Sequence, residues 1–429
     1  MRILTISVNA WNNTIATGNT FSNFFSSISD GDEIANIYCR NENIENSICS
    51  RYFRITERDI IYSLCHLKAP GVSFDKNIIP RVTSEEMSVL AADSSKGNAL
   101  RKNRPALLLF AREFVWSLRS WKSKKLKCFL DDFKPEVIYM HGHGNWYMHN
   151  ILWFCAQYTG AKVALYSGDD VYSYHRNEPL QRLYHWILRK KLQKSFIKAD
   201  VVFGGSPQLC KEYGDIFHRD IIPLYKVCNN LKSPCKSERS FPLHAVYCGN
   251  LLYGRENILA ELVEQIKILN SDGLKIQMHI YTANPLSDEN RFLLNDGENC
   301  LYQGQKPFSE IVSILNECDF SILAESFDPE SIKMTRLSFS TKIIDYMQAT
   351  SALICVGPSN IGSVDYIKRS GIGIYVPNTK IFSQVITPFL LNPSLIDQSI
   401  QEKYEYAIKF HSKPVLIEYL NRLVYSKCQ

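Results

Sequence analysis

From about residue 241 onward, short β-rich runs alternate with segments of helical periodicity, and this alternation restricts the fold more than any other feature of the chain. Residues 244–249 have the pattern of a strand that ends in glycine, and apolar residues at helical spacing follow at 258–269. Strands that alternate with helices form βαβ units, in which the strands lie parallel in one sheet. Further strands are predicted at 275–281, 300–303, 319–324, 352–357 and 373–376, with helices at 309–317, 341–349 and 363–369.

The first half repeats this architecture with longer insertions, through predicted strands at 2–8, 136–141, 162–167 and 200–205. A chain of 429 residues also exceeds what one hydrophobic core usually supports. The sequence therefore predicts an α/β protein of two Rossmann-like domains.

The domain limits follow from the segment 223–242, which contains three prolines and two adjacent asparagines. We expect an N-terminal domain at 1–228, a C-terminal domain at 229–410 and a hinge in the segment that joins them. Residues 411–429 are expected to form a helix that packs back toward the N-terminal domain. The segment from about 66 to 104 has little periodicity, which predicts an insertion or mobile loop that faces a ligand.

Composition narrows the class of protein. Hydrophobic residues make up 45% of the chain and charged residues 21%, as in globular proteins. The apolar run at 1–8 is too short to span a membrane and lacks the cleavage site of a signal peptide, so a cytoplasmic location is expected. The thirteen cysteines include no pair at Cys-x-x-Cys spacing, which indicates reduced thiols and predicts neither a disulfide framework nor a metal site.

Much of the net charge of +6 is concentrated in two segments, 119–127 and 182–194, which interleave lysine and arginine with tryptophan, tyrosine and leucine. The pattern suits an anionic membrane surface, although each segment alone is as typical of a solvated helix face. Because both occur in the same half of the chain, the pair favours peripheral contact with the inner face of a membrane. Nucleic acid is not expected as a partner, since no nucleic-acid-binding signature accompanies the bases.

The most informative motif is the run Ser-Phe-Ser-Thr-Lys-Ile-Ile-Asp-Tyr-Met at 338–347. Ser340 and Thr341 occur where a loop becomes a helix, so free backbone amides and the helix dipole can receive a diphosphate there. Lys342 adds a full charge, and Asp345 follows on the same helix face, where its carboxylate could accept hydrogen bonds from ribose hydroxyls. A capped helix with a surface charge pair is the structural alternative.

This motif resembles the nucleotide-sugar signature of bacterial group 1 glycosyltransferases, which are retaining, family 4-like enzymes of the GT-B fold. The resemblance implies two Rossmann-like domains facing a cleft, a nucleotide-diphosphate sugar as donor substrate, and no required cofactor. In that family a Ser/Thr-Lys pair opens the helix and an acidic residue on it binds the ribose. Those roles would fall on Thr341, Lys342 and Asp345.

The chain departs from the family pattern at one position. Many relatives carry two glutamates eight positions apart, and here Leu337 holds the first of these positions while Asp345 holds the second. Glu325, which precedes an unusual insertion, or Glu330 could supply the missing carboxylate. Glu325 is therefore a catalytic candidate.

Two glycine turns resemble those of the family. Gly249 and Asn250 follow the first strand of the second half, and Arg255 lies close enough in sequence to give bidentate hydrogen bonds to phosphate oxygens. Such a turn is commonplace by itself, and its place relative to the Ser-Thr-Lys turn makes it a candidate for the pyrophosphate. Gly18 follows the first strand of the chain and resembles the family's N-terminal glycine loop near the donor phosphates and the acceptor.

Catalytic candidates in the first half follow two predicted strands. His141 and His143, separated by a glycine, could bind a sugar hydroxyl or stabilise developing charge, and structural histidines are an equal alternative. Asp169 and Asp170 are adjacent, so at most one is expected to face the cleft and to orient or deprotonate the acceptor hydroxyl. The alternative is an Asp-Asp turn that caps the next helix.

The resemblance implies transfer of a sugar to an acceptor hydroxyl with retention. The expected acceptor is a lipid-linked glycan in the synthesis of capsule, O-antigen or exopolysaccharide. Two rival functions stay open, a nucleotide-sugar epimerase of GT-B fold and a non-catalytic GT-B protein that docks to a membrane or a partner. A Rossmann dehydrogenase is not expected, because neither half opens with a Gly-x-Gly-x-x-Gly turn.

Overall fold

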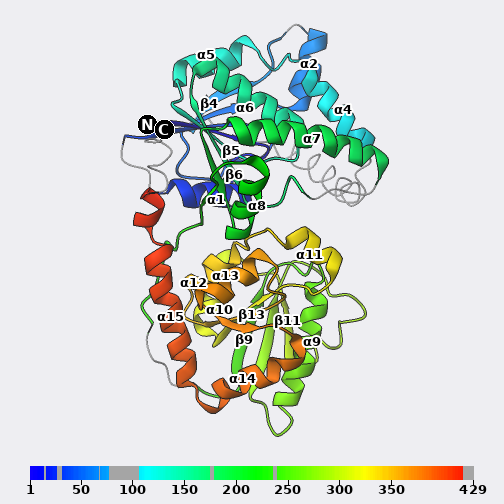
Figure 1. Cartoon of the computed structure of the whole chain (residues 1–429), viewed down its shortest axis with the longest axis vertical. Helices are drawn as coiled ribbons and strands as arrows, with labels where there is room; N and C mark the ends of the chain where they lie inside the picture. The colour runs from blue at the N-terminus through cyan, green and yellow to red at the C-terminus, as the bar shows by residue number, and fades with distance from the viewer. Residues whose placement is uncertain are drawn as a thin grey trace. The chain divides into compact units, whose positions relative to one another are not determined.

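The computed structural model describes residues 1–13, 16–26, 31–66, 68–76, 106–173, 178–234 and 239–418. The chain divides into two compact units, each an α/β structure with one sheet (Figure 1). Unit 1 comprises Met1–Gly204, Cys210–Leu224 and the residues from Ile417 onward; unit 2 comprises Gly205–Leu209 and Tyr225–Leu416.

Unit 1 contains an eight-stranded sheet in the order β4-β3-β2-β1-β5-β6-β7-β8, in which every neighbouring pair is parallel except β3 and β4. The predicted strands of the first half are confirmed as β1, β5, β6 and β7, whereas β2, β3, β4 and β8 were not predicted. The strands are β1 Arg2–Ser7, β2 Glu33–Tyr38, β3 Arg51–Arg54, β4 Val72–Asp75, β5 Val137–His141, β6 Lys162–Ser167, β7 Val201–Gly204 and β8 Ile222–Pro223. The helices are α1 Ala16–Phe25, α2 Glu57–His66, α4 Ala106–Ser117, α5 Lys124–Phe133, α6 Trp146–Thr159, α7 Pro179–Lys198 and α8 Pro207–Phe217.

Unit 2 contains a six-stranded, fully parallel sheet in the order β11-β10-β9-β12-β13-β14. All six strands and the four helices predicted in this half are confirmed. The strands are β9 Leu243–Cys248, β10 Ile276–Tyr281, β11 Cys300–Gly304, β12 Phe320–Ala324, β13 Ala352–Val356 and β14 Ile374–Val376. The helices are α9 Arg255–Leu269, α10 Phe308–Glu317, α11 Pro329–Thr335, α12 Lys342–Gln348, α13 Gly362–Ser370, α14 Phe382–Leu391 and α15 Ser394–Phe410, with a short 3-10 turn at Thr379–Ile381.

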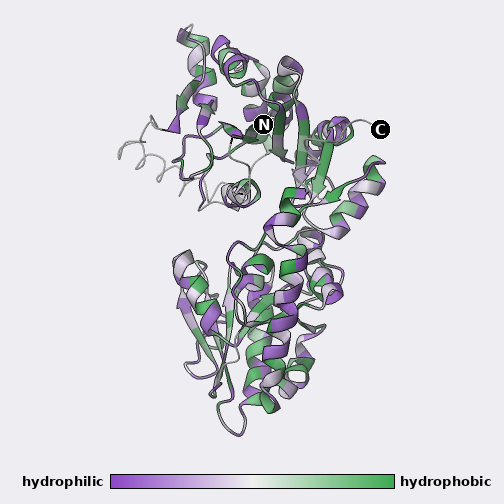
Figure 2. Cartoon of the chain, turned by 90° about the vertical axis from the view of Figure 1, so that its left-hand side faces the viewer, coloured by the Kyte–Doolittle hydropathy of each residue, from purple (hydrophilic) through white to green (hydrophobic). Residues whose placement is uncertain are grey.

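The sheet of unit 2 is buried on both faces, as expected of a parallel sheet covered by crossover helices. Successive side chains of a strand point to opposite faces. Accordingly Ala245 and Tyr247 of β9 belong to one apolar cluster, and Val246 and Cys248 belong to the other. Figure 2 shows hydrophobic residues gathered on the strands, while the helices carry both hydrophobic and hydrophilic residues.

Two buried polar side chains tie distant parts of the chain into unit 2. The Lys403 ammonium on α15 donates to the carbonyl oxygens of Tyr346 at 2.6 Å, Ala349 at 2.8 Å and Ser351, and thereby holds the end of α12. The hydroxyl of Ser206, which stands before the linker in sequence, donates to the carbonyl of Leu337 at 2.7 Å. Both residues are fully buried.

Parts of three predictions lie outside the described residues: 67 and 77–104 of the proposed insertion, 235–238 of the linker and 419–429 of the proposed C-terminal helix. Among the described residues, no helix combines the length and apolarity needed to cross a membrane. Eleven cysteines of this part of the chain are free thiols, so no disulfide joins them.

Candidate active site

A cavity of about 310 Å³ lies at the carboxyl ends of β9 and β10 in unit 2. The sheet order places β10 on one side of β9 and β12 on the other, so the order in which successive strands are added to the sheet reverses at β9. Open α/β sheets bind ligands at such a switch point. The cavity is lined by residues from the turns after both strands and by Lys342 and Asp345 of α12.

Gly249, which directly follows β9, leaves room for the Lys342 side chain. A β-carbon at position 249 would stand 1.8 Å from the Lys342 Nζ, and the backbone there has a φ of +154°. The ammonium lies 4.8 Å from the ring centroid of Tyr247 and 3.5 Å from its hydroxyl oxygen. Burial, together with the positive charge of Arg255, lowers the pKa of Lys342 to about 8. The cavity therefore contains a cation that an anionic ligand would stabilise.

Asp345 lines the same cavity from the next turn of α12. Burial raises the pKa of its carboxyl group to about 6, against the opposing effects of Lys226 and Lys342. Above that pH the carboxylate can accept hydrogen bonds from a ligand's hydroxyl groups. The predicted pair on one helix face is thus present in the structure, with both members at the cavity wall.

The start of α12 differs from the prediction. The helix begins at Lys342 and has seven residues, and Thr341 makes no side-chain capping bond. The backbone amide of Ser340 donates to the Ser363 hydroxyl at 2.8 Å. This amide is therefore not free for a phosphate, and Lys342 is the stronger feature of the anion site.

Arg255, at the start of α9, is held by a carboxylate. Its Nη2 lies 3.0 Å and 2.9 Å from the two oxygens of Glu325, and its Nη1 donates to the Asn250 side-chain oxygen at 2.8 Å. The side chains of Arg255 and Glu325 are only 12% and 3% exposed. A diphosphate would compete with Glu325 for this guanidinium.

The structure separates the two glutamates considered as replacements for Leu337. Glu325 directly follows β12 and contacts Arg255, whereas Glu330 lies on α11 in an exposed ion pair with Lys333. Leu337 is buried. Of the two glutamates, only Glu325 is part of the charged cluster beside the cavity.

Sequence reasoning missed several residues of this site. Tyr247 orders the turn by donating to the Asn250 carbonyl at 2.5 Å, and Asn284 accepts from the Leu251 amide at 3.0 Å. Thr282, Asn284 and Lys306 line the cavity. Their positions just after β10 and β11 were the available signal, because such turns border the crevice of a parallel sheet.

The Gly18 prediction was wrong in its location. Gly18 lies inside helix α1 rather than in a loop, and a β-carbon there would stand 2.1 Å from the Asn12 carbonyl oxygen. Close packing of the helix against the Asn12 backbone explains why glycine occupies this position.

His141 and His143 have different surroundings. His141 ends β5 among aromatic rings, with ring centroids 4.8 Å from both Phe21 and Tyr166. His143 lines a cavity of about 240 Å³ in unit 1, and burial lowers its pKa to about 4. The His143 imidazole at this cavity is thus uncharged near neutral pH.

Asp170 has a structural role in the turn after β6. One of its oxygens accepts from the amides of Tyr172 at 3.2 Å and Ser173 at 2.8 Å and from the Tyr213 hydroxyl at 3.0 Å. Asp169 is exposed.

Among the described residues, no group of three or more histidine, cysteine, aspartate or glutamate side chains is arranged to hold a metal ion.

No protein-family model and no curated protein sequence matches this chain. Solved structures do match it. Sucrose-phosphate synthase from Thermosynechococcus elongatus superposes with a TM-score of 0.62 at 13% identity, covering 99% of this chain and 98% of the other. The UDP-forming trehalose-phosphate synthase from Burkholderia xenovorans, in complex with glucose-6-phosphate, gives 0.57 at 10% identity over 99% and 100%.

A third neighbour, a trehalose-6-phosphate protein from E. coli bound with UDP-2-fluoro glucose, gives a TM-score of 0.56 at 10% identity over all of both chains. These neighbours are GT-B proteins, and like this chain they contain two α/β units. At such low identity the similarity concerns the fold. This chain therefore has the GT-B fold.

Proposed function

We propose that this protein is a glycosyltransferase that transfers a sugar from a nucleotide-diphosphate donor to an acceptor hydroxyl, with retention. The observation that carries the proposal is the cavity in unit 2, where Lys342 and Asp345 present a cation and a carboxylate from one helix face. A diphosphate and the neighbouring ribose of a nucleotide need these two kinds of group. Fold neighbours described as UDP-forming or bound to a UDP-sugar support the same reading.

In this proposal the donor's leaving diphosphate gains negative charge as the bond to the sugar breaks. Lys342 and Arg255 are the cations that would stabilise it, and preorganised charge in a site sheltered from water is effective in this role. Glu325 would yield Arg255 to the diphosphate and could then face the sugar. In unit 1, His143 and Asp169 are the candidates for contact with the acceptor hydroxyl.

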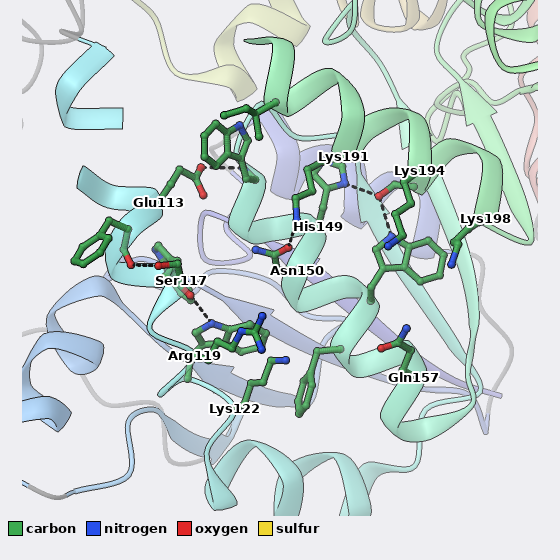
Figure 3. A pocket seen from close by; sticks show the side chains of 18 of the residues that line it. Glu113, Ser117, Arg119, Lys122, His149, Asn150, Gln157, Lys191, Lys194 and Lys198 are labelled. Carbon is green, nitrogen blue, oxygen red and sulfur yellow. Dashed lines mark hydrogen bonds between the residues drawn. The ribbon is translucent and has the colours of Figure 1, made fainter. Parts of the chain in front are cut away.

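The acceptor we propose is a lipid-linked glycan in the synthesis of a bacterial surface polysaccharide, with the protein bound peripherally to the cytoplasmic face of the membrane. Support comes from a cavity of about 870 Å³ in unit 1, to which both basic segments contribute. Its walls carry Trp121 and Phe154, and its five bases face one carboxylate, Glu113. Figure 3 shows Arg119 and Lys122 on one side and the α7 bases Lys191, Lys194 and Lys198 on the other.

The charges of this basic cavity favour an anionic surface. Glu113 accepts hydrogen bonds from the amides of Trp146 and Tyr147 and from the Tyr184 hydroxyl, so its carboxylate is already occupied. Among the described residues, none of the five bases has a carboxylate within ion-pair distance. Two helices that line the cavity also carry exposed apolar side chains: Phe114 on α4 is 66% exposed and Trp186 on α7 is 59% exposed.

Flotation with lipid vesicles tests the membrane part of the proposal. We expect co-flotation with vesicles that contain phosphatidylglycerol and not with pure phosphatidylcholine, and loss of binding in the Lys194→Glu, Lys198→Glu double variant. The matched control is Lys267→Glu with Lys275→Glu, two exposed lysines of unit 2. Equal binding by both double variants would count against a role for the basic cavity.

A thermal-shift screen against nucleoside diphosphates and nucleotide sugars tests the transferase proposal. A ligand that binds the native state raises the melting temperature by mass action. We expect at least one nucleoside diphosphate to do so in the wild type and to lose the effect in Lys342→Ala. Product analysis with the acceptor omitted then separates transfer from epimerisation, and the absence of any nucleotide effect would contradict the proposal.

A further inference from the structure

Unit 1 contains a second small cavity, distinct from the basic cavity, at the carboxyl edge of its own sheet. Its volume is about 240 Å³. The order of strands places β2 on one side of β1 and β5 on the other, so the order in which successive strands are added to this sheet also reverses at β1. The polar lining consists of Asn9, Thr17, Arg40, Arg112, His143 and Asn145, which follow β1, β2 and β5 or belong to α1 and α4.

The cavity is dominated by hydrogen-bond donors. Arg40 donates from Nη1 to the Asn9 side-chain oxygen at 3.1 Å, and Arg112 donates from Nη2 to that of Asn145 at 2.6 Å. Each of these two asparagine oxygens thus accepts a hydrogen bond from an arginine. Because an arginine has five N–H donors, each guanidinium keeps further donors for a ligand. Thr17 lies in the first turn of α1, where the helix dipole favours negative charge.

Negative charge near the two arginines is limited. Glu42 lies 3.7 Å from Arg40, and its other oxygen accepts from the Ala10 amide at 3.1 Å. Among the described residues, Arg112 has no carboxylate within ion-pair distance. Its guanidinium instead lies 5.7 Å from the ring centroid of Tyr147. Of the two guanidinium groups, Arg40 thus has a carboxylate partner in Glu42, and Arg112 has none among the described residues.

Two buried polar atoms of the lining have no hydrogen-bond partner, namely Nε of Arg112 and Nε2 of His143. Leaving a buried donor or acceptor unpaired usually costs about 1–3 kcal/mol. Proteins retain such groups where a ligand satisfies them. The imidazole of His143 is uncharged near neutral pH, so it can either donate or accept.

We infer that this cavity binds an anionic group, a carboxylate or a phosphate ester, carried by the sugar unit of the acceptor. That the ligand is the acceptor rests on the proposed function. That the ligand is anionic rests on the two arginines, on the unpaired Arg112 Nε and on the position of Thr17 in the first turn of α1. A neutral sugar would leave the Arg112 guanidinium without an anion. A charged sugar unit places its anion between Arg40 and Arg112 and its hydroxyl groups toward His143 and the asparagines.

Saturation-transfer NMR on the full chain, with glucuronate, glucose 6-phosphate and glucose as separate probes, tests the inference. We expect at least one of the two charged sugars to bind, and glucose to bind at least about tenfold more weakly than that charged sugar does. Arg112→Gln and Arg40→Gln should each weaken the charged probe about tenfold, since each removes a charge-assisted hydrogen bond. The matched control is Arg58→Gln, an exposed arginine of α2.

The two charged probes distinguish a carboxylate from a phosphate as the recognised group. Equal binding of glucose, or charged-sugar binding that neither arginine variant weakens, would overturn the inference. Binding of UDP to the same variants reports separately on the proposed function, because Arg40 and Arg112 do not line the unit 2 cavity. Normal UDP binding with no charged-sugar binding refutes the inference alone, and the reverse result refutes the donor proposal alone. If Arg112→Gln lowers the melting temperature sharply, Arg40→Gln provides the independent result.

Discussion

Lys342 occupies the space that a β-carbon would take at Gly249, with only 1.8 Å between its Nζ and that position. The glycine directly follows β9 and the lysine begins α12, so the contact joins two elements far apart in sequence. Neither residue alone defines the cationic wall of the cavity.

Gly249→Ala is therefore expected to displace the Lys342 side chain. We expect nucleoside diphosphate affinity to fall about tenfold or more, because a charge-assisted hydrogen bond contributes about 1.5–3 kcal/mol. Calorimetric titration with UDP measures the effect. Gly273→Ala is the matched control, since Gly273 also has a positive φ, +135°, and has open space around its β-carbon position. If both variants bind UDP equally, the contact has no role in binding.

Lys342→Ala should weaken diphosphate binding by about tenfold to a hundredfold while the protein remains folded. The reason is that Lys342 supplies a charge to the cavity rather than a packed apolar contact. Calorimetry gives the dissociation constant, and circular dichroism checks the fold. Lys267→Ala, which removes a lysine from a surface ion pair, should bind as the wild type does. An unchanged constant in Lys342→Ala would refute the donor site.

Nucleotide affinity should be greatest between about pH 6 and pH 8. Below the raised Asp345 pKa of about 6 the carboxylate gains a proton and loses its charge, and above the lowered Lys342 pKa of about 8 the ammonium loses its proton. Titrations with UDP from pH 5 to pH 9 measure both limbs. The Asp345→Asn variant should bind UDP more weakly, and the part of the affinity loss below pH 6 that comes from Asp345 should be absent from its pH profile. An identical acid limb in that variant would assign the limb to the nucleotide's own phosphate.

Asp345→Asn should also stabilise the ligand-free protein at neutral pH. The pKa of Asp345 is raised from 3.8 to about 6 in the folded protein. As the pH rises, the unfolded chain therefore loses this proton at a lower pH than the folded protein does, and the free energy of unfolding falls between about pH 4 and pH 6. The gain at pH 7 is at most about 3 kcal/mol at about 1.4 kcal/mol per pKa unit, and solvent access to the partly exposed group reduces it. Melting temperatures at pH 4 and pH 7 test the sign, since the gain should be largely lost at pH 4.

Glu325→Gln should destabilise the ligand-free protein by about 3–5 kcal/mol, because it leaves the buried Arg255 without its ionic partner. Saturating UDP should restore part of that stability if the diphosphate takes over the guanidinium. Chemical denaturation with and without UDP measures both effects. Glu330→Gln removes a glutamate from an exposed pair and should change stability by less than about 1 kcal/mol. A loss of stability in Glu325→Gln that UDP leaves unchanged would contradict the exchange of partners.

The sequence predicted the second sheet well because its strands are short apolar runs bounded by glycine and polar turns. The misses in the first sheet have physical causes. β2 contains Asn36, which is fully buried and donates to the Thr5 and Ser7 hydroxyls, so its polarity concealed a core strand. β3 and β4 have four residues each and end in charged or polar residues.

The site was predictable where one helix carries its members, as with Lys342 and Asp345. It was not predictable where tertiary contacts decide. Nothing in the sequence indicates that Arg255 is bound by Glu325 seventy positions away, or that Arg40 and Arg112 line one cavity. For Asp170 the local pattern offered a turn role, which its bonds to the Tyr172 and Ser173 amides match, but it could not show the bond from the Tyr213 hydroxyl.

The Ser206 contact limits how natural recombination could exchange the ligand specificity that we propose for unit 2. A single crossover near residue 225 would import a new second half and retain the recipient's residues 205–209, which belong to the same unit. In the parent protein the Ser206 hydroxyl donates to the Leu337 carbonyl, and it would stand 3.2 Å from a β-carbon at Gly362. In the recombinant, residues 337 and 362 would come from one parent and residue 206 from the other, so these close contacts would no longer be matched. Functional chimaeras of this protein should therefore inherit both stretches from one parent.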